Sequence, residues 1–162
     1  MTKYVTGIQK IEFGEIAPDG GCATVFAALG YTREGTLAFN VSDDQTQDIN
    51  VEELDDPIMQ TVTTKGTTDI SYSMTDFDND NMVSVFGGQV VNNQYQAPDQ
   101  TPVVEKSLKI TPRTGKPFIY PRVKMTGKIN YDSTGKIFQI DVTCRKLKPE
   151  KVGVPSFMWG EP

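Results

Sequence analysis

The sequence predicts a mainly β fold, an antiparallel β-sandwich or barrel that carries one short α-helix. Three observations lead to this prediction. Apolar and polar residues alternate over many short segments, turn-forming Gly and Pro separate those segments, and only one segment has helical spacing. Since helices do not alternate with strands along the chain, a parallel α/β sheet is not expected. Residues 1–147 are expected to form one β domain, followed by a C-terminal arm at residues 148–162.

Four strands are expected in the first half of the chain. Two early strands are placed at residues 8–16 and 24–29, on either side of a turn-forming segment at residues 17–21. Two later strands alternate strictly, and their apolar positions are Leu37, Phe39 and Val41 in one and Ile70, Tyr72 and Met74 in the other. Alternate residues of a strand point to the same face, so both later strands are predicted to be half-buried.

The second half of the chain repeats this pattern. Alternating runs occupy residues 104–110, 123–129 and 138–144. A turn at residues 112–117, which contains Pro and Gly, separates the first two runs. The last two runs are joined by residues 130–136, which are rich in turn formers. We therefore expect these two runs to form a β-hairpin.

One short helix is expected at residues 79–86, where apolar residues follow helical spacing. Asp76 or Asp78 can accept hydrogen bonds from the free N–H groups of its first turn. Gly87 and Gly88 follow the segment and supply a left-handed stop. The sequence therefore defines both ends of this helix.

The sharpest candidates for metal ligands are Asp76, Asp78 and Asp80. Their DxDxD spacing resembles the start of a calcium-binding EF-hand loop. However, Asn81 occupies the sixth position of that loop instead of Gly, and Gly87 occupies the twelfth position instead of the bidentate Glu. Carboxylates at the start of a helix also cap its free amides. Helix capping is the favoured interpretation, and calcium binding is the alternative.

The composition argues against an enzyme. Histidine, the commonest general base, is absent from all 162 residues. No serine lies in a GxSxG motif, and no Gly-rich phosphate-binding loop is present. Cys22 and Cys144 lack CxxC spacing and are expected to be free thiols. We therefore expect a non-catalytic protein without a cofactor.

Hydropathy and charge argue against a membrane anchor and against tight binding of nucleic acid. No apolar run approaches the roughly 20 residues of a membrane span, so no membrane anchor is expected. The net charge is −5, with acidic side chains concentrated at residues 43–56 and basic ones at residues 106–151. This balance disfavours tight binding of nucleic acid. The asymmetry suits head-to-tail contact between copies, and solvated faces explain it equally well.

Two segments do not serve a compact core in an obvious way. Residues 42–66 are acidic and lack strong periodicity, so a long loop is expected there, although acidic runs are commonly just solvated. Residues 148–162 are apolar around two prolines and need a partner surface, either on their own domain or on a neighbouring copy. The candidates for this contact are Phe157, Met158 and Trp159.

A set of short segments follows in a characteristic order between residues 35 and 90. They are GTLAFNV (35–41), DINVEE (48–53), DPI (56–58), GTTDISYSMTDFD (66–78) and, after a short helix, FGG (86–88). In the order of its elements this part of the chain, roughly a third of the whole, resembles the tail tube (major tail) proteins of long-tailed bacteriophages. The segment from Pro149 to Pro162 has no counterpart in that pattern.

The resemblance implies a β-barrel-like sandwich with one helix on its flank. It also implies a virion protein, made in the host cytoplasm, that forms stacked hexameric rings and contacts other tail proteins. DNA would pass transiently through the resulting hollow tube. In that family a long loop reaches the next ring, which corresponds here to residues 42–66. The candidate inter-ring contacts are Asp48, Ile49, Val51, Glu52, Glu53, Asp56 and Ile58.

Two alternatives stay open at this point. A tail terminator or head-completion protein would share the fold and form a single ring. A monomeric β-sandwich module that binds carbohydrate or acts as an adhesin would expose an aromatic platform and would not self-assemble. Self-assembly separates the module from both ring-forming proteins, and stacking separates those two from each other.

Overall fold

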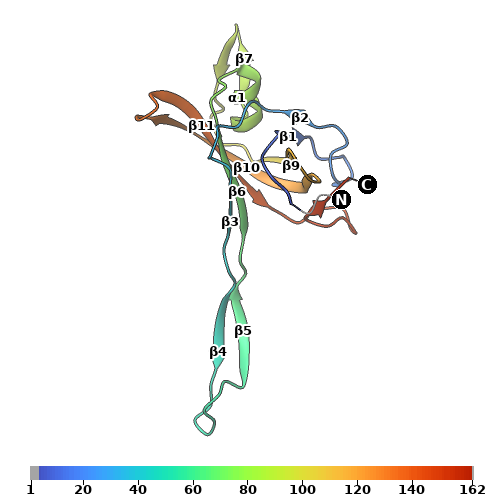
Figure 1. Cartoon of the computed structure of the whole chain (residues 1–162), viewed down its shortest axis with the longest axis vertical. Coiled ribbons are helices and arrows are strands. Elements are labelled where there is room, and N and C mark those ends of the chain that lie inside the picture. Colours follow the sequence, from blue (N-terminus) through green and yellow to red (C-terminus); the bar gives the residue numbers. More distant parts are fainter. Residues whose placement is uncertain (1–3, 162) are drawn as a thin grey trace.

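The computed structural model describes residues 4–161 and confirms the prediction of a mainly β, antiparallel fold with one short helix. Eight strands form one sheet in the order β2-β1-β9-β10-β11-β6-β3, and the eighth, β12, pairs with β10 (Figure 1). The bounds of these strands are β1 Lys10–Gly14, β2 Ala27–Ala28, β3 Ala38–Val41, β6 Thr68–Met74, β9 Val104–Thr111, β10 Phe118–Asp132, β11 Ile137–Lys146 and β12 Met158–Trp159.

This sheet folds over on itself to enclose the core. Phe13 on β1 stacks on Tyr72 on β6, with 6.4 Å between ring centroids, although three strands lie between β1 and β6 in the sheet. Opposite ends of one sheet therefore face each other as two layers. The sheet does not close into a barrel, because β2 and β3 remain its two edges within the described chain.

The core follows the predicted alternation. Inward-facing side chains on five strands are at most 6% exposed, whereas most of their sequence neighbours on the other face are polar. The strand residues of this core are Ile11, Phe13, Ile70, Tyr72, Met74, Leu108, Ile110, Tyr120, Val123, Met125, Ile140, Val142 and Cys144. Cys144 is a free thiol, and so is the half-buried Cys22, as predicted.

Strand β10 bends where it passes from one layer to the other. Its register shifts between Tyr120 and Val123, beside the buried Pro121. Such a bulge suits Pro, which has no N–H to donate to a ladder. The carbonyl of Pro121 accepts a hydrogen bond from the buried Ser107 hydroxyl at 2.7 Å. Consequently the first half of β10 pairs with β9 and β12, and the second half pairs mainly with β11.

Helix α1 (Asn79–Phe86) lies where it was predicted. Asp78 is the N-cap, and its carboxylate accepts a hydrogen bond from the Asp80 N–H at 3.1 Å. Gly87 ends the helix with φ of 75°, a left-handed conformation that favours glycine. The buried Val85 packs so closely against Gly127 of β10 that a β-carbon at position 127 would overlap the Val85 side chain.

Several boundaries differ from the prediction. The first two strands are shorter than expected, and β3 is an edge strand on which Phe39 is 45% and Val41 67% exposed. The prediction that β3 is half-buried through these two residues was wrong, because the opposite layer does not extend over this edge. Only Leu37, just before β3, packs against the core.

A hairpin made by β7 (Gln89–Val91) and β8 (Gln94–Gln96) was not predicted. Its turn residues Asn92 and Asn93 have φ of 49° and 59°, as a two-residue hairpin turn requires. The hairpin lies beside α1 (Figure 1), and the Tyr95 hydroxyl donates to the carbonyl of Gly87 at 2.7 Å. The Asn-Asn pair was the available sequence signal.

Candidate assembly surfaces

The most prominent surface feature is an arm formed by residues 42–66, here called the hairpin arm. Strands β4 (Gln45–Ile49) and β5 (Met59–Thr64) pair antiparallel along it. Figure 1 shows this arm extending far from the body, as a continuation of β3 and β6. The expectation of a long loop was therefore wrong. Pairing between β4 and β5 satisfies the backbone hydrogen bonds here, but neither face of the hairpin is buried, so the sequence shows no alternation of apolar and polar residues.

Polar side chains reinforce the hairpin arm along its length. The Thr63 hydroxyl donates to the carbonyl of Gln45 at 3.1 Å, and the Gln60 amide donates to Asp48 at 2.8 Å. At its base, the Ser42 N–H donates to the carbonyl of Thr67 at 2.9 Å. The arm thus has a defined shape up to its junction with the sheet.

The hairpin arm exposes apolar side chains that its own strands do not cover. Its main contacts are between β4 and β5, and an isolated two-stranded hairpin is marginally stable in water. The exposed apolar residues are Ile49, Leu54, Ile58, Met59 and Val62, each between 36% and 58% exposed. Such a surface is typical of a segment that binds a partner.

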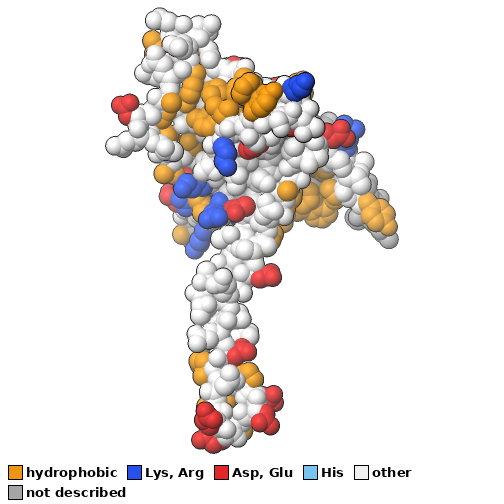
Figure 2. Space-filling model, turned by 90° about the vertical axis from the view of Figure 1, so that its left-hand side faces the viewer, with side chains coloured by type: hydrophobic (Ala, Val, Ile, Leu, Met, Phe, Trp, Pro, Cys, Tyr) orange, Lys and Arg blue, Asp and Glu red, His pale blue; other side chains and the backbone are white. Residues whose placement is uncertain are grey.

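The hairpin arm is also the most acidic part of the chain. Residues 42–66 contain seven Asp and Glu and a single basic residue, Lys65, so the arm carries −6 and, since the whole chain carries −5, the remainder carries +1. Figure 2 shows the acidic side chains gathered at the far end of the arm, next to hydrophobic ones. The predicted contact residues all lie on this arm: Asp48 and Ile49 in β4, Val51, Glu52, Glu53 and Asp56 in the connection, and Ile58 just before β5.

The C-terminal arm lies against its own domain. In β12, Trp159 pairs with Phe118 and Met158 with Ile119 on β10. The Phe157 ring lies 5.0 Å from the ring of Tyr120. Of the two partner surfaces considered for this segment, the structure thus shows the intramolecular one. Trp159 remains half-exposed, with the ammonium of Lys116 5.4 Å from its ring centroid.

The outer face of the sheet is polar across β10, β11 and β6. Arg145 forms a paired contact with Asp69, and this contact holds the pKa of Asp69 below its ordinary value of 3.8. The Arg33 guanidinium similarly lowers the pKa of Asp132. A third carboxylate, Asp141, accepts hydrogen bonds on this face from Ser73, Asn130 and Gln139. The remaining side chains of the face are uncharged or are bases without an ion pair, namely Ser71, Lys124, Thr126, Lys128 and Thr143.

The three carboxylates considered as metal ligands serve different purposes. Asp76 accepts a hydrogen bond from the Tyr31 N–H at 2.9 Å, and Asp78 caps α1. Asp80 lines a depression beside the helix. Within residues 4–161 no group of three or more His, Cys, Asp or Glu could hold a metal ion. The capping interpretation is confirmed for Asp78.

No helix among the described residues is long and apolar enough to cross a membrane.

Comparison with known proteins adds no family assignment. No family model matches the sequence, and a search of curated proteins finds no match.

Proposed function

We propose that this protein is a non-catalytic structural subunit that assembles into stacked rings, as the tail tube proteins of long-tailed bacteriophages do. The rings are hexameric in this proposal, and their stack forms a hollow tube through which DNA passes. The observation that carries the proposal is the hairpin arm. It is an ordered extension with uncovered apolar side chains and a concentrated negative charge, projecting from the body of the protein.

The two edges of the sheet support assembly within a ring. The outer edges of β2 and β3 have no strand partner in the described chain. Unpaired edges are templates for pairing with another chain, and an exposed apolar edge is rarely left open in a monomer. Phe39 and Val41 on β3 make that edge apolar. Pairing of the β2 edge of one copy with the β3 edge of the next is a heterologous contact. Repeating it forms a closed ring when the rotation between neighbouring copies adds up to a full turn.

The polar outer face of the sheet suits a wall past which DNA slides. A contiguous basic surface would bind phosphates tightly, with release of counterions. On this face, however, Asp69 and Asp132 neutralise Arg145 and Arg33, and uncharged hydroxyls lie between the remaining bases. We place this face toward the lumen of the proposed tube.

The test is negative-stain electron microscopy of the purified protein over a range of concentrations, with a variant lacking residues 44–65. In this deletion Asp43 precedes Gly66 directly, and Asp-Gly is a favoured two-residue hairpin turn. The flanking Ser42 and Thr67 are already hydrogen-bonded to each other. The body is therefore expected to keep its fold, which circular dichroism and urea unfolding check.

Hollow tubes from the wild type, and only single rings from the deletion variant, are the expected results. Single rings from both proteins would instead identify a tail terminator or completion protein. A monomer at every concentration, in the presence of purified tail-initiating proteins as well as alone, would contradict ring assembly and favour the β-sandwich binding module.

A further inference from the structure

We infer that the tip of the β10–β11 hairpin inserts into a depression beside β1, β2 and α1 of a second copy of this chain, as one of the contacts between neighbours in a ring. The tip is defined as residues 129–138. This inference rests on the proposed ring assembly and adds to it the two surfaces that meet. Neither surface includes the hairpin arm or the C-terminal arm.

The tip continues the core face of the sheet beyond the second layer. Met125 and Ile140 are buried on that face, but Ile129 is 52%, Tyr131 48% and Phe138 59% exposed on the same face further along the two strands. The register pairs Tyr131 with Phe138, and their rings lie 4.9 Å apart. An apolar sheet face of this kind is normally covered by another layer, which this chain does not itself provide.

The tip is held in a fixed position for such a contact. The Arg33 guanidinium donates to Asp132 and to Gln139, both at 2.6 Å, so it joins the two strands just below the turn. Asp132 also accepts a hydrogen bond from the Thr134 N–H at 3.0 Å. A preorganised tip loses little conformational freedom on binding.

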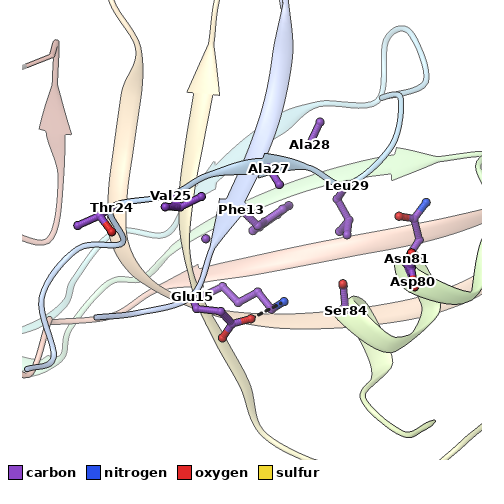
Figure 3. A pocket seen from close by; sticks show the side chains of 12 residues that line it. Phe13, Glu15, Thr24, Val25, Ala27, Ala28, Leu29, Asp80, Asn81 and Ser84 are labelled. Atoms are coloured by element: carbon purple, nitrogen blue, oxygen red, sulfur yellow. Dashed lines mark ion pairs between the residues drawn. The ribbon is translucent and has the colours of Figure 1, made fainter. Parts of the chain in front are cut away.

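The depression offers a complementary surface. It has a volume of about 460 Å³ and is lined by apolar side chains of β1 and the segment around β2, with the first turn of α1 on its other side (Figure 3). Its apolar lining consists of Phe13, Val25, Ala27, Ala28 and Leu29. Aromatic side chains that fill an apolar pocket are the usual anchors of protein interfaces.

Charges at the two surfaces are also complementary. Lys136 lies in the turn of the tip, is exposed, and forms no ion pair within the described chain. The depression presents Asp80, which also has no ion pair among the described residues, and Glu15, which pairs with Lys106 at 3.1 Å. Attraction between opposite charges fixes the orientation of a contact more than its strength.

The positions of the two surfaces require two molecules. In Figure 1 the tip projects on one side of α1, and β1 and β2 lie on the other side. A copy that offers its tip to one neighbour therefore still offers its depression to another. Such a head-to-tail contact propagates around a ring.

Cysteine cross-linking tests the contact directly. One variant carries Phe138→Cys and another carries Ala28→Cys, both in a Cys22→Ser background that keeps the buried Cys144. Mild oxidation of an assembled mixture is expected to give a disulfide-linked dimer, because the proposed contact brings the two β-carbons to the separation of about 4 Å that a disulfide requires. The control mixture pairs Phe138→Cys with Val152→Cys, a 97% exposed position outside the depression, and is expected to stay monomeric on a denaturing gel.

A charge exchange provides the second test. Lys136→Glu alone and Asp80→Lys alone are each expected to raise the concentration needed for ring formation at least about tenfold, and the double variant is expected to restore it. Sedimentation velocity measures this concentration. Lys124→Glu, the same charge change at an exposed site on the outer face of β10 and outside both surfaces, is the matched control for Lys136→Glu.

The outcomes separate this inference from the proposed function. Rings or tubes without the 138–28 cross-link, or without rescue by the charge exchange, would overturn the inference and leave the tube proposal standing. Cross-linked oligomers that never stack would support the inference and overturn the tube. A monomer at every concentration would overturn both.

Discussion

Arg145 and Asp69 form a two-point contact between β11 and β6. The guanidinium donates from Nε to one carboxylate oxygen at 2.9 Å and from Nη2 to the other at 3.1 Å. Two parallel hydrogen bonds fix the relative position of both side chains. This hydrogen bonding lowers the pKa of Asp69 from 3.8. The stability that the contact contributes therefore depends on pH.

Asp69→Asn is expected to lower the urea midpoint at neutral pH and to have less effect as the pH falls below 3.8. A carboxyl group whose pKa is depressed by folding stabilises the protein above its unfolded pKa, and this contribution disappears as the pH falls through its folded pKa. Urea unfolding at a series of pH values measures the difference. Asp55→Asn, at an exposed site of the hairpin arm without an ion pair in the described chain, is the control. An effect of Asp69→Asn that did not change with pH would contradict this account.

Gly127→Ala is expected to destabilise the protein by about 1–3 kcal/mol, because the added methyl group overlaps the side chain of Val85 on α1. Adding Val85→Ala to the same chain is expected to remove part of that cost, so the double variant is more stable than the sum of the single effects predicts. Thr126→Ala, on the outer face of β10, is the control. Additive effects in urea unfolding would show that this close approach is not the cause.

Secondary structure could be predicted from the sequence where the signal was local or where one face of a strand was buried. Helix α1 has a capping Asp78 before it and Gly87 after it, so both of its ends were predictable. The β10–β11 hairpin was predictable from buried positions such as Val142 that alternate with polar ones. In both cases the pattern in the chain is the direct result of burial or capping.

The hairpin arm could be proposed as a contact segment but not as a pair of strands. Both faces of β4 and β5 lie in solvent, so burial imposes no alternation on residues 45–64. The depression could not be predicted at all, because its lining comes from three separate stretches, residues 13–15, 24–29 and 80–84, together with Lys106. Only the folded sheet brings them together.

Cys144 is expected to resist alkylation until the protein unfolds. It is fully buried, and this burial raises the pKa of its thiol to about 12, so almost no reactive thiolate forms at neutral pH. Labelling by iodoacetamide in native buffer and in urea, followed by mass spectrometry, measures this. Cys22, which is only half-buried, provides an internal comparison. Rapid native labelling of Cys144 would indicate that β11 opens locally.

Phe157→Ala is expected to release the C-terminal arm from its domain and to cost about 1–2 kcal/mol, since the ring is partly exposed and packs on Phe118 and Tyr120. Trp159 is the only tryptophan, so its fluorescence reports this release as a red shift. Val152→Ala, at a site 97% exposed in the same arm, is the control. An unchanged emission spectrum would mean that β12 holds the arm in place without the Phe157 ring.

Tube formation is expected to weaken with rising salt because of the charge on the hairpin arm. The arm carries −6 and the remainder of the chain +1, so an arm that reaches the body of the next ring is attracted to it. Salt shortens the range of that attraction from about 10 Å at 0.1 M to about 3 Å at 1 M. The double variant Glu52→Gln/Glu53→Gln should therefore form shorter tubes at low salt and respond less to added salt. Glu34→Gln/Asp99→Asn removes the same charge from exposed sites outside the arm and should behave as the wild type. If salt instead lengthened the wild-type tubes, the arms would be meeting an acidic surface, and the contact between rings would have to be made by the apolar residues of the arm alone.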